Sequence, residues 1–158
     1  MAKVALVTGA SRGIGRATAE AFARAGYQVA ANYCRSKEQI EQFSAQMERE
    51  GCAVIPVQAD VSDPEQVERM VQTVQRQFGH IDVLVCNAGI ARQGLLTDFS
   101  PADWRQMMAV NLDGTFYCCR SVLPGMIRRQ SGCIINVSSM WGQVGASCEA
   151  CYSATKGA

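Results

Sequence analysis

The chain has 158 residues, of which 48% are hydrophobic and 18% are charged. This composition suits one soluble globular domain with a single apolar core. The formal net charge is +1, so no basic field points to a nucleic acid or to an anionic membrane surface. No apolar run approaches the roughly 18 residues of a membrane span, and the N-terminus lacks the plan of a signal peptide. We therefore expect one cytoplasmic domain over residues 1–158.

Segments of strand length alternate with segments of helical periodicity along the whole chain. Asp63 followed by Pro64 is typical of a helix start, and Ser100 is the expected N-cap of a long helix. Pro124 lies inside that helix and should bend or break it. The expected strands are 3–8, 28–33, 53–58, 81–86 and 133–138. The expected helices are 13–25, 36–50, 64–78 and 101–129, and a last one starts near Cys151.

This alternation predicts an α/β fold with a parallel sheet and helices on both of its faces. Right-handed crossovers make the sheet doubly wound, with a strand order that begins 3-2-1-4-5. The fourth strand should be buried on both faces. A Rossmann-type sheet has at least a sixth strand, whereas this chain ends on a helix that has barely begun. We therefore expect a fold that is incomplete on its C-terminal side.

A glycine-rich turn, Thr8-Gly9-Ala10-Ser11-Arg12-Gly13-Ile14-Gly15, separates the first strand from the first helix. Glycines permit a tight turn and a close approach of the backbone to a pyrophosphate, and the helix N-terminus offers free N–H groups. Any strand–helix connection can use such a turn, but its place in a βαβ unit favours dinucleotide binding. The residues expected to contact the dinucleotide here are Gly9, Ser11, Arg12, Gly13, Ile14 and Gly15.

The spacing Gly-x-x-x-Gly-x-Gly resembles the short-chain dehydrogenase/reductase family. Further residues match the motifs of that family in order, namely Asp60, Asn87-Ala88-Gly89, Asn111, Ser139 and Tyr152-x-x-x-Lys156. The resemblance covers the entire chain and implies a nicotinamide-dependent oxidoreductase. It implies further cofactor contacts by Asp60, Val61, Asn87, Ala88, Gly89, Tyr152 and Lys156. Cys86 is a departure, because the family often has another asparagine there.

The end of the second expected strand bears on the choice of nicotinamide. Its sequence, Asn32-Tyr33-Cys34-Arg35-Ser36, has no acidic residue to hold the ribose 2′-OH of NAD. Arg35 follows the strand and Arg12 lies in the glycine turn, and a guanidinium suits a 2′-phosphate. Either arginine alone is best explained as a solvated surface charge. The two together, without an acid, favour NADP(H).

Tyr152 and Lys156 are separated by one helical turn and share a helix face. An ammonium nearby stabilises a phenolate, so Tyr152 can exchange a proton with a carbonyl oxygen to which Ser139 also donates a hydrogen bond. The resemblance implies that Lys156 also holds the nicotinamide ribose and that Asn111 holds a water in a proton relay. We choose Ser139 over Ser138 because its distance in sequence from Tyr152 is the one usual in the family.

The eight cysteines should stay reduced in a cytosolic chain, and Cys86, Cys118 and Cys133 lie in apolar runs, where cysteine packs as a small hydrophobe. Cys148 and Cys151 form a C-x-x-C before the tyrosine. A structural zinc would need four ligands, which the sequence does not offer, so no metal is expected. A redox dithiol is conceivable near a helix N-terminus, and loop packing is the simpler explanation.

The segment from Trp141 to Glu149 resembles the bacterial 5-aminopentanone reductases that act on elongation factor P. Glu149 could pair with a cationic amine on such a substrate, and a solvated loop charge is the alternative. The whole chain also resembles 3-oxoacyl-carrier-protein reductases, but on the loop motif we favour the elongation factor P substrate and keep the 3-oxoacyl substrate as the alternative. Both resemblances predict reduction of a ketone to an alcohol with NADPH, on a small-molecule or a carrier- or protein-attached substrate. An inactive dinucleotide-binding module is the alternative from another class.

Only Gly157 and Ala158 follow the lysine. A helical stub of one or two turns is marginal without tertiary support, and the apolar fifth strand would be an uncovered edge. We therefore expect a piece of a longer enzyme that is poorly stable and inactive on its own. The resemblance places the later strands, a substrate lid and much of the interface of a homodimer or homotetramer beyond this chain.

Overall fold

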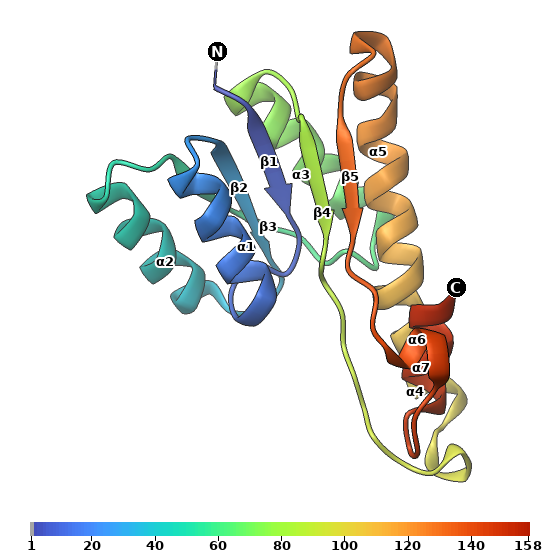
Figure 1. Cartoon of the computed structure of the whole chain (residues 1–158). Coiled ribbons are helices and arrows are strands. Elements are labelled where there is room, and N and C mark those ends of the chain that lie inside the picture. Colours follow the sequence, from blue (N-terminus) through green and yellow to red (C-terminus); the bar gives the residue numbers. More distant parts are fainter. Residues whose placement is uncertain (1) are drawn as a thin grey trace.

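The computed structural model describes residues 2–158 and contains an open sheet of five parallel strands. The strand order is β3-β2-β1-β4-β5, which confirms the doubly wound α/β prediction. Figure 1 shows the strands running in one direction, with their carboxyl ends at the bottom of the view. The strands are β1 (Val4–Val7), β2 (Gln28–Tyr33), β3 (Val54–Gln58), β4 (Val83–Cys86) and β5 (Cys133–Asn136).

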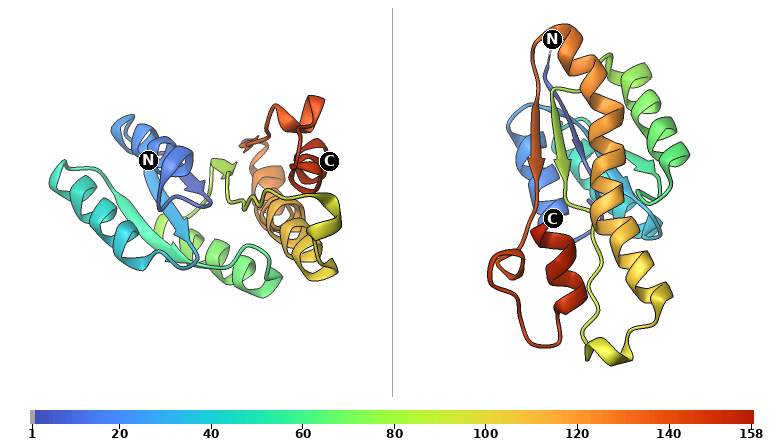
Figure 2. Two further views of the ribbon diagram at one scale, coloured as in Figure 1. Left: turned by 90° about the horizontal axis from the view of Figure 1, so that it is seen from below. Right: turned by 90° about the vertical axis from the view of Figure 1, so that its right-hand side faces the viewer.

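Helices cover both faces of the sheet. α1 (Gly13–Arg24) and α2 (Lys37–Arg49) pack on one face, and α3 (Pro64–Phe78) and α5 (Gly114–Arg129) pack on the other. The remaining helices lie beyond the carboxyl ends of β4 and β5 (Figures 1 and 2). These are η1 (Leu96–Asp98), α4 (Pro101–Met108), the π-helical turn η2 (Ala109–Asp113), α6 (Trp141–Val144) and α7 (Ala150–Gly157).

The sheet separates two apolar clusters, and β1 supplies side chains to both. Val4 and Leu6 face the cluster under α3 and α5, whereas Ala5 and Val7 face the cluster under α1 and α2. Every residue of β1 and of β4 is buried, as expected for strands that are covered on both faces. β5 differs, because three of its four residues are exposed. The prediction that Cys133 packs as a buried hydrophobe is therefore wrong.

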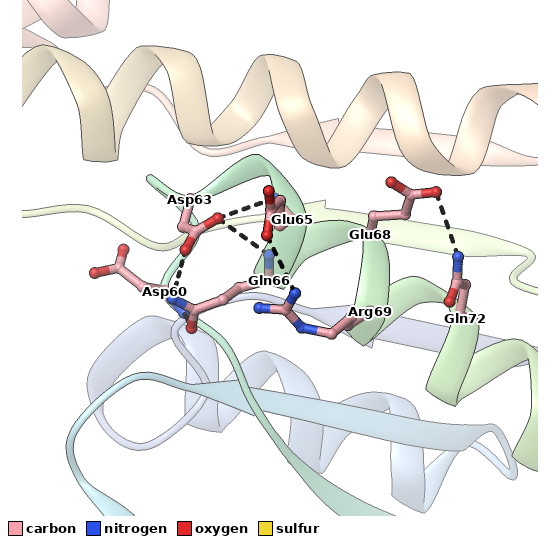
Figure 3. Close-up of polar contacts among 7 residues, drawn as sticks. All are labelled: Asp60, Asp63, Glu65, Gln66, Glu68, Arg69 and Gln72. Carbon is pink, nitrogen blue, oxygen red and sulfur yellow. Dashed lines mark hydrogen bonds and ion pairs between the residues drawn. The ribbon is translucent and has the colours of Figure 1, made fainter.

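The predicted helix starts are confirmed in atomic detail. The Asp63 carboxylate accepts hydrogen bonds from the backbone N–H groups of Glu65 and Gln66 and from the Gln66 side chain (Figure 3). Gln66 also accepts a bond from the backbone N–H of Asp60 at 3.0 Å. The cap of α3 thus also fixes the backbone at Asp60. Ser100 caps α4 in the same way, in a capping box with Asp103.

The long helix expected over 101–129 is interrupted, but not at Pro124. α5 continues through Pro124 to Arg129, and the interruption is the π turn at Ala109–Asp113. A π turn holds an extra residue compared with an α turn, and here it turns the Asn111 side chain inward, where it is 5% exposed. Sequence periodicity does not reveal this turn, because the residues on both sides remain helical.

The fourth strand begins at Val83 rather than at residue 81. Just before the strand, the Asp82 carboxylate accepts a hydrogen bond from the backbone N–H of Val4 at 2.8 Å and lies 3.2 Å from His80 Nε2.

All eight cysteines are free thiols. Within residues 2–158 no group of three acidic, histidine or cysteine side chains could hold a metal ion. None of the helices in residues 2–158 is long and apolar enough to cross a bilayer.

Candidate active site

A crevice opens where the loops after β1 and β4 diverge, and its two walls are joined by hydrogen bonds. Thr8 Oγ1 accepts bonds from the backbone N–H groups of Asn87 and Ala88 at 2.9 and 3.0 Å. The Asn87 side-chain amide donates to the carbonyls of Thr8 and Gly9 at 2.9 and 3.2 Å. The glycine turn and the Asn-Ala-Gly segment are therefore one unit, in which each loop satisfies backbone groups of the other.

The glycines of this turn are required by close approach and by backbone conformation. Gly9 has φ +65°, and a Cβ atom there would lie 2.9 Å from Ala88 Cα. Gly13 has φ +57°, a region that residues with a side chain rarely adopt. A Cβ atom on Gly15 would collide with the Gly9 carbonyl and the Asn87 amide. Gly15 thus lets α1 pack against the turn.

The crevice holds a cavity of about 540 Å³. Most of the predicted cofactor-binding residues line it, namely Gly9, Ser11, Arg12, Gly13, Ile14, Arg35, Asp60, Val61, Asn87, Ala88 and Gly89. Three predicted residues do not line it, namely Gly15, Tyr152 and Lys156. A second groove, of about 400 Å³, lies between α3 and α5 and contains none of the motif residues.

Sequence reasoning missed several lining residues, of which Asn32 is the most informative. Asn32 is 1% exposed at the end of β2. Its side-chain oxygen accepts a bond from Gly9 N–H at 3.2 Å, and its amide donates to the carbonyls of Val57 and Ala59. An asparagine within an otherwise apolar strand was the available signal, since a buried amide needs partners. The other missed lining residues are Tyr33, Cys34, Ser36, Ala59, Ser62, Ile90, Gln106 and Val110.

Three charged residues line the cavity: Arg12 in the glycine turn, Arg35 after β2 and Asp60 after β3. Arg12 and Arg35 are both exposed and line the cavity. Asp60 accepts bonds from the backbone and hydroxyl of Ser62 at 2.9 and 2.6 Å. Partial burial, together with the Asp60 carboxylate, raises the pKa of the Cys34 thiol. The thiol therefore stays protonated, and the two arginines are the cations that line the cavity.

Tyr152 and Lys156 lie one turn apart on α7, as predicted, with Lys156 Nζ 5.9 Å from the centre of the Tyr152 ring. Nζ donates a hydrogen bond to the Val137 carbonyl at 2.8 Å, and burial lowers the pKa of Lys156. Ser138 donates to the Lys156 carbonyl at 2.7 Å and so helps to hold α7. Ser139 Oγ accepts a bond from the Trp141 N–H at 3.2 Å, and this leaves its hydroxyl hydrogen available for donation.

The Asn111 side chain is engaged within the protein. Its oxygen accepts a bond from the Ile90 N–H at 2.8 Å, and its amide donates to the Ile90 carbonyl at 2.9 Å and to Thr155 Oγ1 at 3.0 Å. Both amide hydrogens are therefore used. The Asn111 carbonyl accepts a bond from Thr115 at 3.2 Å. Through its side chain, Asn111 joins the loop after β4 to α7.

Glu149 is buried rather than solvated, with 7% of its surface exposed, so its interpretation as a solvated loop charge is wrong. One carboxylate oxygen accepts a bond from the Gln93 amide at 2.9 Å, and the other is buried without a partner among the described residues. A second bond, from Gly94 N–H to the Cys148 carbonyl at 3.0 Å, joins the same two loops. Of the C-x-x-C pair, Cys148 is exposed at φ +61° and Cys151 is buried.

A doubly wound parallel sheet, a glycine turn at its reversal point and a cavity between the diverging loops define a dinucleotide-binding domain. The sequence narrows this class further. Residues 3–158 match the family model described as short chain dehydrogenase. The chain therefore belongs to the short-chain dehydrogenase family.

Several relatives give more detail. The 3-oxoacyl-[acyl-carrier-protein] reductase FabG of Staphylococcus aureus is 46% identical over 156 residues, which cover 99% of this chain and 63% of that protein. A 3-oxoacyl-[acyl-carrier-protein] reductase of Synechocystis is 43% identical, covering 98% and 63%. The crystal structure of a gluconate 5-dehydrogenase from Burkholderia cenocepacia, in complex with NADP and tartrate, superposes with a TM-score of 0.91 at 38% identity and covers 98% and 60%. The chain thus spans about three fifths of the length of these relatives.

Proposed function

We propose that this chain carries the cofactor-binding and catalytic residues of an NADP(H)-dependent reductase that converts a ketone to an alcohol. We propose a 3-oxoacyl thioester on acyl carrier protein as the substrate. The observation that carries the reductase proposal is the connection of the cavity to Tyr152. Ile90 lines the cavity, its backbone is held by Asn111, and Asn111 is bonded to the helix of Tyr152 and Lys156. The identity to two 3-oxoacyl reductases supports the substrate class.

The residues of the crevice fit a dinucleotide. Gly9 lets the turn lie close against Ala88, where a Cβ atom would collide, and the start of α1 presents free N–H groups, as a pyrophosphate requires. Arg12 and Arg35 line the cavity, and β2 ends without an acidic residue of its own to hold a ribose 2′-hydroxyl. The related gluconate 5-dehydrogenase was solved with NADP. These observations support a 2′-phosphorylated cofactor.

The bound nicotinamide would supply the hydride. Tyr152 would donate a proton to the carbonyl oxygen of the substrate, and Ser139 would hold that oxygen with its free hydroxyl hydrogen. The Lys156 ammonium, held by the Val137 carbonyl, would stabilise the phenolate that Tyr152 becomes. In the reverse direction the same phenolate would take the proton back. Asn111 would keep these groups aligned with the cavity through its bonds to Ile90 and Thr155.

A second substrate, the 5-aminopentanone group of elongation factor P, has support from the loop sequence alone. Glu149 could hold its cationic amine only if the Gln93 amide moved away, because Gln93 occupies one carboxylate oxygen and protein covers the other. The relatives named above carry other substrates in their names. We therefore rank this substrate below the 3-oxoacyl thioester.

For the 158 residues alone we propose cofactor binding with little turnover, because the chain spans 63% of its reductase relatives. We also propose that the full-length protein is a cytoplasmic homodimer or homotetramer.

Oxidation of NADPH, followed by its absorbance with a 3-oxoacyl thioester and with ketone-modified elongation factor P, tests the function. Faster turnover of the modified factor would reverse the substrate ranking. Binding of NADPH without turnover of either substrate by the full-length protein would indicate a binding module. Tighter binding of NADH than of NADPH would refute the cofactor proposal.

A further inference from the structure

A buried chain of hydrogen bonds runs from the cofactor cavity to the backbone of Tyr152, and Thr155 is its last side chain. Ile90 lines the cavity, and both its N–H and its carbonyl bond to the Asn111 side chain. Asn111 then donates to Thr155 Oγ1 at 3.0 Å. Thr155 Oγ1 donates in turn to the Tyr152 carbonyl at 2.8 Å. The hydroxyl therefore connects the cavity wall to the helix of the proposed proton donor.

Thr155 is placed to orient other residues rather than to touch a substrate. It is 4% exposed and does not line the cavity. Its single hydroxyl hydrogen is used on Tyr152, and a lone pair accepts the bond from Asn111. Without the hydroxyl, a buried amide hydrogen of Asn111 would lose its partner, which is costly. The arrangement thus needs an oxygen at this position and not only a side chain of the right shape.

α7 depends on such contacts because it is short. It has eight residues, and a helix of that length is marginal unless tertiary contacts support it. The bonds of Ser138 and Lys156 hold its C-terminal end to the loop after β5, and Glu149 holds its N-terminal end to Gln93. Thr155, in the C-terminal half of the helix, accepts the bond that ties α7 to the helical layer containing Asn111. A small change there would displace Tyr152 relative to the cavity.

We propose that Thr155 is a positioning residue, whose hydroxyl aligns Tyr152 with the cofactor cavity through Asn111. This inference rests on the proposed reductase function, because it concerns the alignment of the proton donor of that reaction. Misplacement of a reacting group by about 1 Å can reduce turnover by about two orders of magnitude. The effect should therefore appear in kcat and not in cofactor affinity.

Two matched substitutions separate the hydroxyl from the methyl group. Thr155→Val keeps the shape and removes the hydroxyl, whereas Thr155→Ser keeps the hydroxyl and removes the methyl. In the full-length protein we expect Thr155→Val to lower kcat about 10- to 100-fold, with NADPH affinity within about threefold of wild type. Thr155→Ser should retain kcat within about threefold. A valine variant with wild-type kcat would overturn the proposal, and so would a serine variant as impaired as the valine variant.

A second measurement is independent of turnover. Amide hydrogen exchange in α7 of the cofactor-free protein should be faster in Thr155→Val than in wild type, and Thr155→Ser should resemble wild type. Equal exchange in all three proteins would overturn the role of Thr155. If wild type shows no turnover of any carbonyl substrate, the reductase function fails, and the exchange comparison alone then decides whether Thr155 anchors α7.

Discussion

The two parts of the site, the cavity and helix α7, are held in place by different physical means. On the side of β1, β2 and β4, the cavity is built on strands that are buried from end to end or nearly so, and each wall is packed against an apolar cluster. On the side of α7, the neighbouring strand β5 is mostly exposed, and Tyr152 and Lys156 depend on hydrogen bonds to backbone carbonyls and to Asn111. Figure 2 shows α6 and α7 lying beyond the end of the sheet rather than on one of its faces.

This difference indicates which part of the site should tolerate substitutions. The structure of a packed wall is little altered by a single small substitution, because many van der Waals contacts stabilise it together. A short helix held by a few polar contacts can shift when one of them is lost. We therefore expect substitutions on the cavity side to change what binds, and substitutions on the α7 side to change turnover while binding persists.

The largest expected effect is a loss of turnover on substitution of Tyr152 in α7. Tyr152→Phe removes the proposed proton donor, and we expect turnover in the full-length protein to fall by about 10²- to 10⁴-fold, because that is the usual contribution of a general acid. NADPH affinity should change little, since Tyr152 does not line the cavity. Tyr117→Phe, on α5 beside the groove away from the motifs, is the matched control. Steady-state kinetics and a binding titration check both; substantial residual turnover in Tyr152→Phe would exclude the proposed role.

The next prediction concerns the cations of the cavity. Replacing Arg12 and Arg35 together with alanine should reduce the preference for NADPH over NADH about 10- to 100-fold, because each guanidinium can make a charge-assisted bond to the 2′-phosphate. Arg49→Ala, at the exposed end of α2, should leave the preference unchanged. Titration with both nucleotides measures the ratio. An unaltered ratio in the double variant would mean that neither arginine contacts the phosphate.

A pair of glycines separates backbone strain from cavity closure. Gly9→Ala and Gly26→Ala both place a side chain at positive φ, +65° and +85°, which costs about 1 kcal/mol or more of folding stability. Only the Cβ atom on Gly9 would press against Ala88, because nothing lies within 4 Å of the corresponding atom on Gly26. We expect both variants to unfold at lower denaturant concentration, and only Gly9→Ala to weaken NADPH binding, by about tenfold. Equal weakening in both would show that strain alone is responsible.

The smallest effect concerns pH. Burial lowers the pKa of Lys156 below its ordinary value of 10.5. As the pH is raised, the ammonium should therefore lose its proton, and turnover should decline, before pH 10.5 is reached. Between the two pKa values the unfolded chain binds more protons than the folded chain, so the contribution of Lys156 to stability rises with pH in the same window. Turnover and stability should thus change in opposite directions there. Lys156→Arg, which keeps its charge, should delay the decline in turnover; an unchanged pH profile would contradict this assignment.

The cavity side was the more predictable one from sequence. The strand order, the caps at Asp63 and Ser100 and the glycine turn all follow from local patterns, and the structure confirms them. Asn32 was missed because its partners come from two distant segments, Gly9 from the glycine turn and Val57 and Ala59 from the end of β3. Local periodicity contains no information on such long-range pairing.

The α7 side was harder to predict. The spacing of Tyr152 and Lys156 indicates a shared helix face, but it does not reveal that Asn111 faces Ile90 and Thr155. That arrangement depends on the π turn, which no residue pattern announces. The buried carboxylate of Glu149 was missed for a similar reason, since its partner Gln93 lies in a distant loop.

The strand order has a consequence for how this fold can change. The chain passes outward from β1 to β2 and β3, then returns to the other side of β1 to form β4 and β5. The loops after β1 and β4 consequently leave the sheet in opposite directions and separate beyond the Thr8–Asn87 contacts. The location of the pocket is thus a property of the path of the backbone. Substitutions of the lining side chains can alter the choice of ligand, but moving the pocket would require a different order of strand connections.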